Sequence, residues 1–201
     1  MTRMTAARSL PILATLAALG ATVPSVAAEV APPADRCDFR AWSKDPDPAG
    51  LDVRTAPRAD ATVIARLPPP RVVDGEKLAV EFHVLGGTGG WLLIEKAEYG
   101  DYGTGAKKVF SGRGWVAASL VDVGVQDEKV RVGPTTGASL VDEPHPAGDG
   151  NDEFLSLGRI LGCRDHWIEM EGEFRVEQKK PGRPVRGWVT GLCGNQVTTC
   201  N

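Results

Sequence analysis

The sequence predicts an all-β protein in which one small unit is used twice. Three observations support this prediction. A short block of sequence occurs twice, no stretch after residue 28 sustains a helical periodicity of apolar residues, and the 201 residues include 24 glycines and 15 prolines. A repeat of this length indicates one structural unit in two copies. Abundant glycine and proline suit short strands joined by tight turns.

The two copies of the block follow the same order. The first consists of GLDVRTAP (50–57), VLG (84–86), Trp91 and GWV (114–116). The second consists of GASLVDEP (137–144), ILG (160–162), Trp167 and GWV (187–189). The distance from Leu85 to Trp91 equals that from Leu161 to Trp167, so we expect the same hairpin in both copies.

Residues 1–28 have the features of a cleaved secretory signal peptide. Arg3 and Arg8 precede an apolar run that is too short to span a membrane, and small residues follow up to Ala28. We therefore expect a mature chain from Glu29 that is periplasmic or secreted and has no membrane anchor. Cleavage leaves 21 basic and 26 acidic residues, a net charge of −5 (21 − 26). No basic surface remains for nucleic acid.

The repeat also predicts the division of the mature chain. Residues 29–49 form an N-terminal lead and a first strand, residues 50–126 the first domain, and residues 130–201 the second. Strands are predicted at 37–43, 51–54, 78–85 and 91–94, and residues 63–67 are a further apolar stretch that ends at Pro68. Long loops are expected at 95–113 and 171–186, and a linker at 122–129.

The repeated motifs resemble those of the bacterial SH3-like domain of exported proteins. The resemblance rests on G-L-D-V-R-x-x-P from Gly50, V-I-A-x-L from Val63, then V-L-G, W and G-W-V. It extends to the second copy, where Val141 stands in place of Arg54. It implies two tandem, small, partly open SH3-like barrels of five strands each, and a role in binding peptidoglycan or peptides.

Four cysteines in an exported chain predict two disulfides. They are Cys37, Cys163, Cys193 and Cys200, which allow three pairings. One combines Cys37–Cys163 with a local Cys193–Cys200 loop, and its rival joins Cys163 to Cys193 within the second domain.

Aromatic side chains are the candidate ligand contacts: Trp42, Trp91, Tyr99, Tyr102 and Trp115. The tryptophans of the repeated motif are expected to lie mainly in the core with one edge exposed. The other three lie beside turns or in a loop, which favours exposure. The loops around Trp91, Tyr99, Tyr102 and Trp115 would present a shallow groove on the first domain. For the three residues beside turns or in a loop, packing between the domains is an equal alternative.

Catalytic and metal-binding patterns are missing from the sequence. His166 lies three residues from Cys163, but no nucleophile signature surrounds it and the further ligands of a zinc site are lacking. The glycine run at 86–90 opens no helix that could bind phosphate. The sequence therefore predicts a monomeric, non-enzymatic binding module without cofactor or metal, with peptidoglycan, cell-wall peptide or an envelope protein as its partner. The alternative is a structural or regulatory scaffold that acts on a periplasmic partner.

Overall fold

The structure is a computed structural model that describes residues 29–73, 75–100, 105–146, 152–176, 181–194 and 196. In these ranges the regular structure is β-strand, apart from the three-residue 3-10 helix η1 (Ala118–Leu120). The all-β prediction is therefore confirmed. The expected signal peptide, residues 1–28, lies outside the described residues. No helix in the described ranges is long and apolar enough to cross a bilayer.

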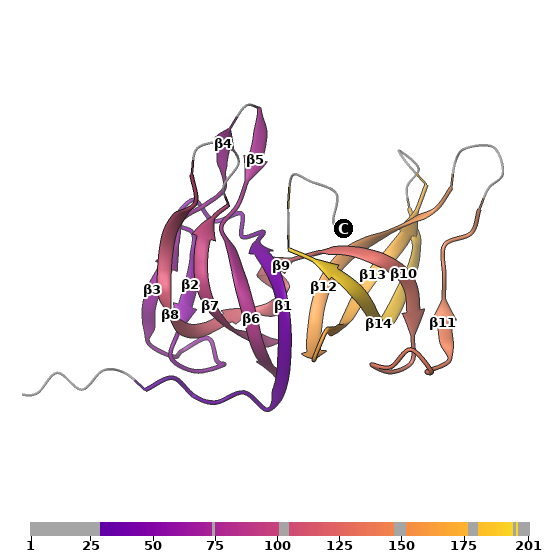
Figure 1. Cartoon of the computed structure of the whole chain (residues 1–201), viewed down its shortest axis with the longest axis horizontal. Helices are drawn as coiled ribbons and strands as arrows, with labels where there is room; N and C mark the ends of the chain where they lie inside the picture. Colours follow the sequence, from indigo (N-terminus) through magenta and orange to yellow (C-terminus); the bar gives the residue numbers. More distant parts are fainter. Residues whose placement is uncertain are drawn as a thin grey trace, which may run out of the picture.

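The first sheet is antiparallel and curls into a partial barrel (Figure 1). Its strand order is β3-β2-β8-β7-β6-β1-β9. The strands are β1 (Asp35–Ser43), β2 (Leu51–Arg54), β3 (Val63–Leu67), β6 (Glu81–Thr88), β7 (Trp91–Tyr99), β8 (Lys107–Ala117) and β9 (Val121–Asp122). A separate hairpin joins β4 (Arg71–Val73) to β5 (Glu76–Leu78).

The second sheet has the order β11-β10-β14-β13-β12 and is also antiparallel. Its strands are β10 (Gly124–Arg131), β11 (Leu140–Asp142), β12 (Phe154–Arg164), β13 (Trp167–Arg175) and β14 (Arg183–Cys193). This order matches β3-β2-β8-β7-β6 strand for strand. We call these two sets of five strands the first and second units. Two complete barrels stay a prediction, since the structure shows two curled sheets whose strand orders correspond.

The second unit begins earlier than the sequence comparison placed it. Arg54 and Arg131 each donate from Nη1 to the carbonyl seven residues on, at 2.8 Å and 3.0 Å. Each arginine also pairs in register with a tryptophan, Trp115 or Trp188. The counterpart of Arg54 is therefore Arg131, and the assignment of Val141 to that position is wrong. The shared pattern V-R-x-x-P, at 53–57 and 130–134, is the sequence feature that identifies the correct alignment.

Three segments expected to be irregular are largely strand. The expected linker at 122–129 forms most of β10, and the expected loops at 95–113 and 171–186 extend the strands on either side. Their charged residues pair across strands, as Arg113 and Glu95 do at 3.1 Å. Cross-strand ion pairs suit exposed positions of a sheet, so a polar composition did not indicate a loop here.

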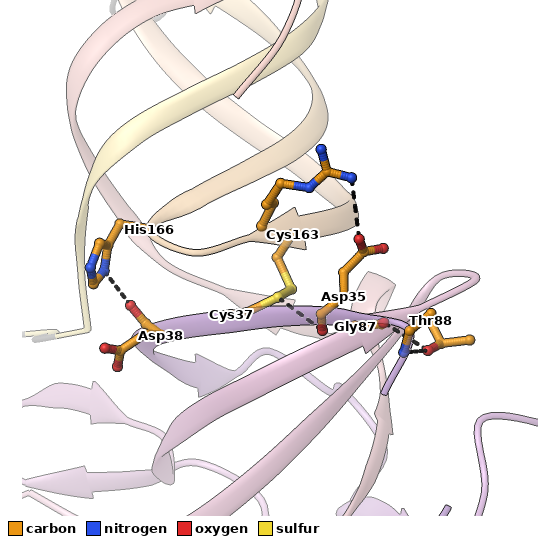
Figure 2. Close-up of a disulfide and its surroundings, with 9 residues drawn as sticks. Asp35, Cys37, Asp38, Gly87, Thr88, Cys163 and His166 are labelled. Carbon is orange, nitrogen blue, oxygen red and sulfur yellow. Dashed lines mark hydrogen bonds and ion pairs between the residues drawn. A yellow bond between two sulfur atoms is a disulfide. The ribbon is translucent and has the colours of Figure 1, made fainter. Parts of the chain in front are cut away.

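The two units are joined through β1, which lies between them (Figure 1). A buried disulfide links Cys37 on β1 to Cys163 on β12, across 126 residues. Asp165 adds two backbone hydrogen bonds to β1, to Arg36 O and from Asp38 N, at 2.7 Å and 2.8 Å. Figure 2 shows the disulfide and, beside it, the ring of His166, whose Nδ1 lies 2.6 Å from Asp38 O.

A second contact between the units comes from the C-terminal segment. The Gln196 side chain accepts from Ala79 N at 2.9 Å and donates to Ala79 O at 3.0 Å. The Gln196 side chain therefore pairs with both the backbone N–H and the backbone C=O of Ala79. Together with the disulfide, this contact holds the two units in one arrangement.

The Cys37–Cys163 bond confirms one of the proposed pairings and excludes a bond between Cys163 and Cys193. Cys193 is itself disulfide-bonded. Cys200 lies outside the described residues, so the Cys193–Cys200 pairing stays a prediction. A buried disulfide in the core indicates folding in an oxidising compartment.

Candidate functional site

Two of the five candidate aromatic residues are not available to a ligand. Trp115 is fully buried, and its Nε1 donates to Ala31 O at 2.9 Å. Tyr99 is 7 % exposed, its hydroxyl donates to Pro69 O, and the Arg71 guanidinium lies 4.2 Å from its ring centre. The expectation that Tyr99 and the edge of Trp115 line an open groove is therefore wrong. Tyr102 lies outside the described residues.

Residues outside the repeat bury these rings. Ala31 belongs to the N-terminal lead, and Arg71 belongs to the β4–β5 hairpin. Burial also raises the pKa of the Tyr99 hydroxyl above its ordinary value, while the charge of Arg71 opposes that shift. The sequence predicts Tyr99 in a loop, and it gives no indication that the β4–β5 hairpin covers this side chain.

Trp91 is the candidate residue that lies at a hollow in the surface. It is partly buried at the start of β7 and lines an open depression of about 170 Å³. The β1–β2 connection, β2 and the turn after it, β3, the end of β8 and η1 contribute the remaining lining residues, which are Asp45, Asp47, Gly50, Leu51, Asp52, Arg54, Ala59, Arg66, Ala117 and Leu120. An indole beside charged groups can contact both the apolar and the polar part of a ligand. We call this depression the Trp91 pocket.

The β1–β2 connection is shaped by its own side chains. Asp45 Oδ1 accepts from Asp47 N at 2.9 Å, and Asp47 Oδ1 accepts from Ala49 N at 2.8 Å. Gly50 follows with a φ of 87°, and a Cβ there would lie 2.0 Å from Leu67 O. These turns place both aspartates in the lining of the Trp91 pocket, where Asp45 is buried and Asp47 is exposed. Gly50 allows the chain to enter β2.

The Trp91 pocket has an excess of negative charge. Its lining contains three aspartates and two arginines, a net formal charge of −1 (2 − 3). Asp52 is paired with both arginines, at 2.6 Å to Arg54 and 2.7 Å to Arg66. Asp45 and Asp47 have no ion-pair partner among the described residues. The pocket therefore favours a ligand that presents a cationic group beside an apolar one.

Trp42 lies apart from this pocket. It is partly buried on β1, where it pairs in register with Glu81 on β6 and with Asp122 on β9. The structure therefore does not bring the four described candidate aromatic residues together in one groove.

The second unit has no equivalent pocket among the depressions found in the described residues. The counterpart of Trp91 is Trp167, and it follows the Asp165 turn that docks on β1. The counterparts of Asp52 and Arg66 are Lys129 and Glu143, so the charges of that cross-strand pair are reversed. The end of the second unit that contacts β1 therefore corresponds to the end of the first unit that carries the open Trp91 pocket.

A polar cluster around His83 lies on the outer side of the first sheet. His83 Nε2 is 2.7 Å from Asp38 Oδ1, and His83 Nδ1 is 3.7 Å from Glu95. The hydrogen bond with His83 lowers the pKa of Asp38. Burial raises the pKa of Glu95, yet hydrogen bonds from Lys96 and Arg113 outweigh it and leave that pKa below its ordinary value. These groups pair with one another, and no group of three metal-ligating side chains was found in the described ranges.

The chain was compared with protein-family models, curated proteins and solved structures, and no match was found.

Proposed function

We propose that this protein is an exported, non-enzymatic binding module. Its ligand is a peptide of the cell wall, in peptidoglycan or free, or a peptide segment of an envelope protein. The observation that carries the proposal is the Trp91 pocket, whose lining includes Trp91 together with Asp45 and Asp47. The repeated SH3-like motifs support a binding role, and the buried disulfide supports a periplasmic or secreted location.

The size and openness of the pocket suit one side chain or amino group of a larger ligand. A volume of about 170 Å³ is smaller than that of a typical small-molecule site, which is roughly 300–1,000 Å³. An indole attracts a cation placed over its ring, and nearby carboxylates strengthen the attraction. A basic side chain or free amino group of a peptide meets both requirements.

A scaffold that acts on a periplasmic partner is the second candidate function. It is favoured by the rigid connection between the units, which combines the buried disulfide with the paired Gln196 and Ala79. In that case the Trp91 pocket would have no ligand, and the relative placement of the units would be the functional feature.

The test is co-sedimentation of the purified, oxidised protein with cell-wall sacculi, with Trp91→Ala and Asp45→Asn/Asp47→Asn variants alongside. We expect the natural protein to sediment and both variants to bind at least about tenfold more weakly, which corresponds to 1.4 kcal/mol. The double asparagine variant keeps the shape of the turn and removes the charge, so it isolates the electrostatic contribution.

Trp167→Ala is the matched control, since it removes the corresponding indole from the second unit. Its sacculus binding is expected to equal that of the natural protein, and urea unfolding checks that each variant is folded. If natural protein and variants sediment equally, or none sediments, the Trp91 pocket is not a wall-binding site. Capture of an envelope protein that also survives in the Trp91→Ala variant would favour the scaffold.

A further inference from the structure

The outer faces of the two units carry corresponding rows of four residues. In the first unit the register aligns Gly86, Leu93, Trp115 and Arg54 across β6, β7, β8 and β2. In the second it aligns Gly162, Glu169, Trp188 and Arg131 across β12, β13, β14 and β10. The neighbours of Leu93 and Trp115 in each strand, Leu92 and Val116, belong to the hydrophobic core. Because side chains alternate along a strand, these rows face away from the core.

The N-terminal lead covers the row of the first unit. Ala31 N donates to Thr55 O at 2.9 Å, and Ala31 O accepts from Trp115 Nε1 at 2.9 Å. Pro33 lies over Gly86, where an added Cβ would be 2.5 Å from the Cβ of the proline. Residues 31–34 therefore cross the sheet from the end of β2 to the end of β6. This segment explains why a tryptophan on the outer face is fully buried.

No described residue covers the row of the second unit as the lead covers that of the first. A Cβ added at Gly162 meets no atom within 4 Å, in contrast to Gly86. Val132, the counterpart of Thr55, is 64 % exposed, and Trp188 is partly exposed. No described residue accepts a hydrogen bond from Trp188 Nε1. The features that hold the lead on the first unit are thus repeated on the second, where no segment in the described ranges lies over them.

We propose that the outer face of the second unit binds an extended peptide segment of a partner protein, seated as residues 31–34 are seated on the first unit. A backbone carbonyl of the peptide accepts from Trp188 Nε1, and the same residue donates to Val132 O. A proline or another residue of similar size fills the space over Gly162. The proposal does not depend on the Trp91 pocket, which lies on the other unit.

A partner, rather than a second copy of this chain, is the expected source of the segment. In each copy the lead is already held on its own first unit by Thr55 and Trp115. Supplying it to a neighbour would break those contacts. Within the row of four, the second unit differs from the first at one position, where Glu169 replaces Leu93 and forms an ion pair with Arg186 at 2.9 Å. A more polar face suits a segment other than the lead, with a polar residue at the middle position.

The test follows the indole N–H resonances of the 15N-labelled, oxidised protein during titration with a peptide. The probe is the peptide of residues 29–36, acetylated and amidated, because its backbone matches the seated lead. We expect a saturable shift of the Trp188 resonance while that of Trp115 stays in place. Because Glu169 replaces an apolar contact, the dissociation constant should be on the order of 0.1–1 mM.

Gly162→Leu is the decisive variant, because a side chain fits there without collision and fills the position of the proline. It should weaken binding at least about tenfold. Trp188→Phe is the second variant, read through backbone amides, and it removes the indole donor. The proposal is overturned by a Trp188 resonance that does not move at millimolar peptide. It is also overturned if the Trp115 resonance shifts instead, or if Trp188 shifts with protein concentration alone.

Discussion

The two units have the same strand order and begin with corresponding hairpins, β2–β3 and β10–β11, but different parts of each unit are covered. In the first unit the lead lies over Trp115 on the outer face, and the Trp91 end stays open. In the second unit the end beside Trp167 docks on β1, and the outer face with Trp188 stays open. Covered and open surfaces are therefore exchanged between the two copies.

This difference arises from segments that are not repeated. The lead and β1 precede the first unit and have no counterpart between the units, where β10 follows β9 after a single residue. Because one residue separates β9 from β10, the chain between the units has no segment that could lie across the second sheet. Two copies of one fold thus expose different surfaces without any change in strand order.

Removal of the disulfide between the units is the largest expected perturbation of this arrangement. Cys37→Ser/Cys163→Ser should lower the free energy of unfolding by about 5 kcal/mol, because the bond closes a 126-residue separation and constrains the unfolded chain. Urea unfolding of the variant and the natural protein measures the loss. A variant that unfolds at the same urea concentration as the natural protein would show that the other contacts suffice.

The two outer-face tryptophans should respond unequally to truncation. Trp115→Ala removes a fully buried ring and its hydrogen bond, so we expect a loss of about 4 kcal/mol. Trp188→Ala removes a partly exposed ring and should cost about 1 kcal/mol. Equal losses in thermal or urea unfolding would contradict the asymmetry between the units.

The matched glycines test the same asymmetry without removing a side chain. Gly86→Ala places a Cβ 2.5 Å from the Cβ of Pro33 and must displace the lead, with an expected loss of about 1–3 kcal/mol. Gly162→Ala meets no atom within 4 Å and should leave stability within about 0.5 kcal/mol. Indole N–H spectra provide a second readout, since only Gly86→Ala should shift the Trp115 resonance.

The smallest expected effect concerns Asp122 on β9, which pairs in register with Trp42 on β1. Burial raises its pKa, against the opposing charge of Lys44 and the N–H of Val123. The folded state then holds the proton to higher pH than the unfolded chain does, so stability falls as the pH rises through this window. Asp122→Asn should therefore be more stable than the natural protein at pH 7. The difference should vanish below the ordinary carboxyl pKa of about 3.9, as urea midpoints at both pH values would show. A variant that is less stable at pH 7 would contradict this sign.

Local sequence patterns predicted several elements well. The strand at 51–54 has the predicted bounds, because alternation and flanking turn residues define it locally. The apolar stretch at 63–67 coincides with β3. The Cys37–Cys163 bond was among the pairings that an exported chain favours. Trp91 lines a surface depression, and its role in ligand binding stays a prediction.

Other expectations failed where contacts between distant residues decide the outcome. The pairing of Glu95 with Arg113 turned an expected loop into strand. The position of Tyr99 depends on Arg71, 28 residues away in the chain, and that of Trp115 on Ala31, 84 residues away. The alignment of the second opening failed because similar turn residues recur at 50–57 and 137–144, while V-R-x-x-P marks the true counterpart.

The sequence by itself determined the all-β class, the repeated hairpin and its tryptophans, since alternation, turn residues and repeat spacing act over a few residues. The tertiary structure decided which tryptophan is buried, which unit keeps an open end and which cysteine pairs with Cys37. Those outcomes depend on where the lead and β1 lie once the sheets have formed. Burial is a property of the neighbours that a residue acquires in space, and local sequence does not specify those neighbours.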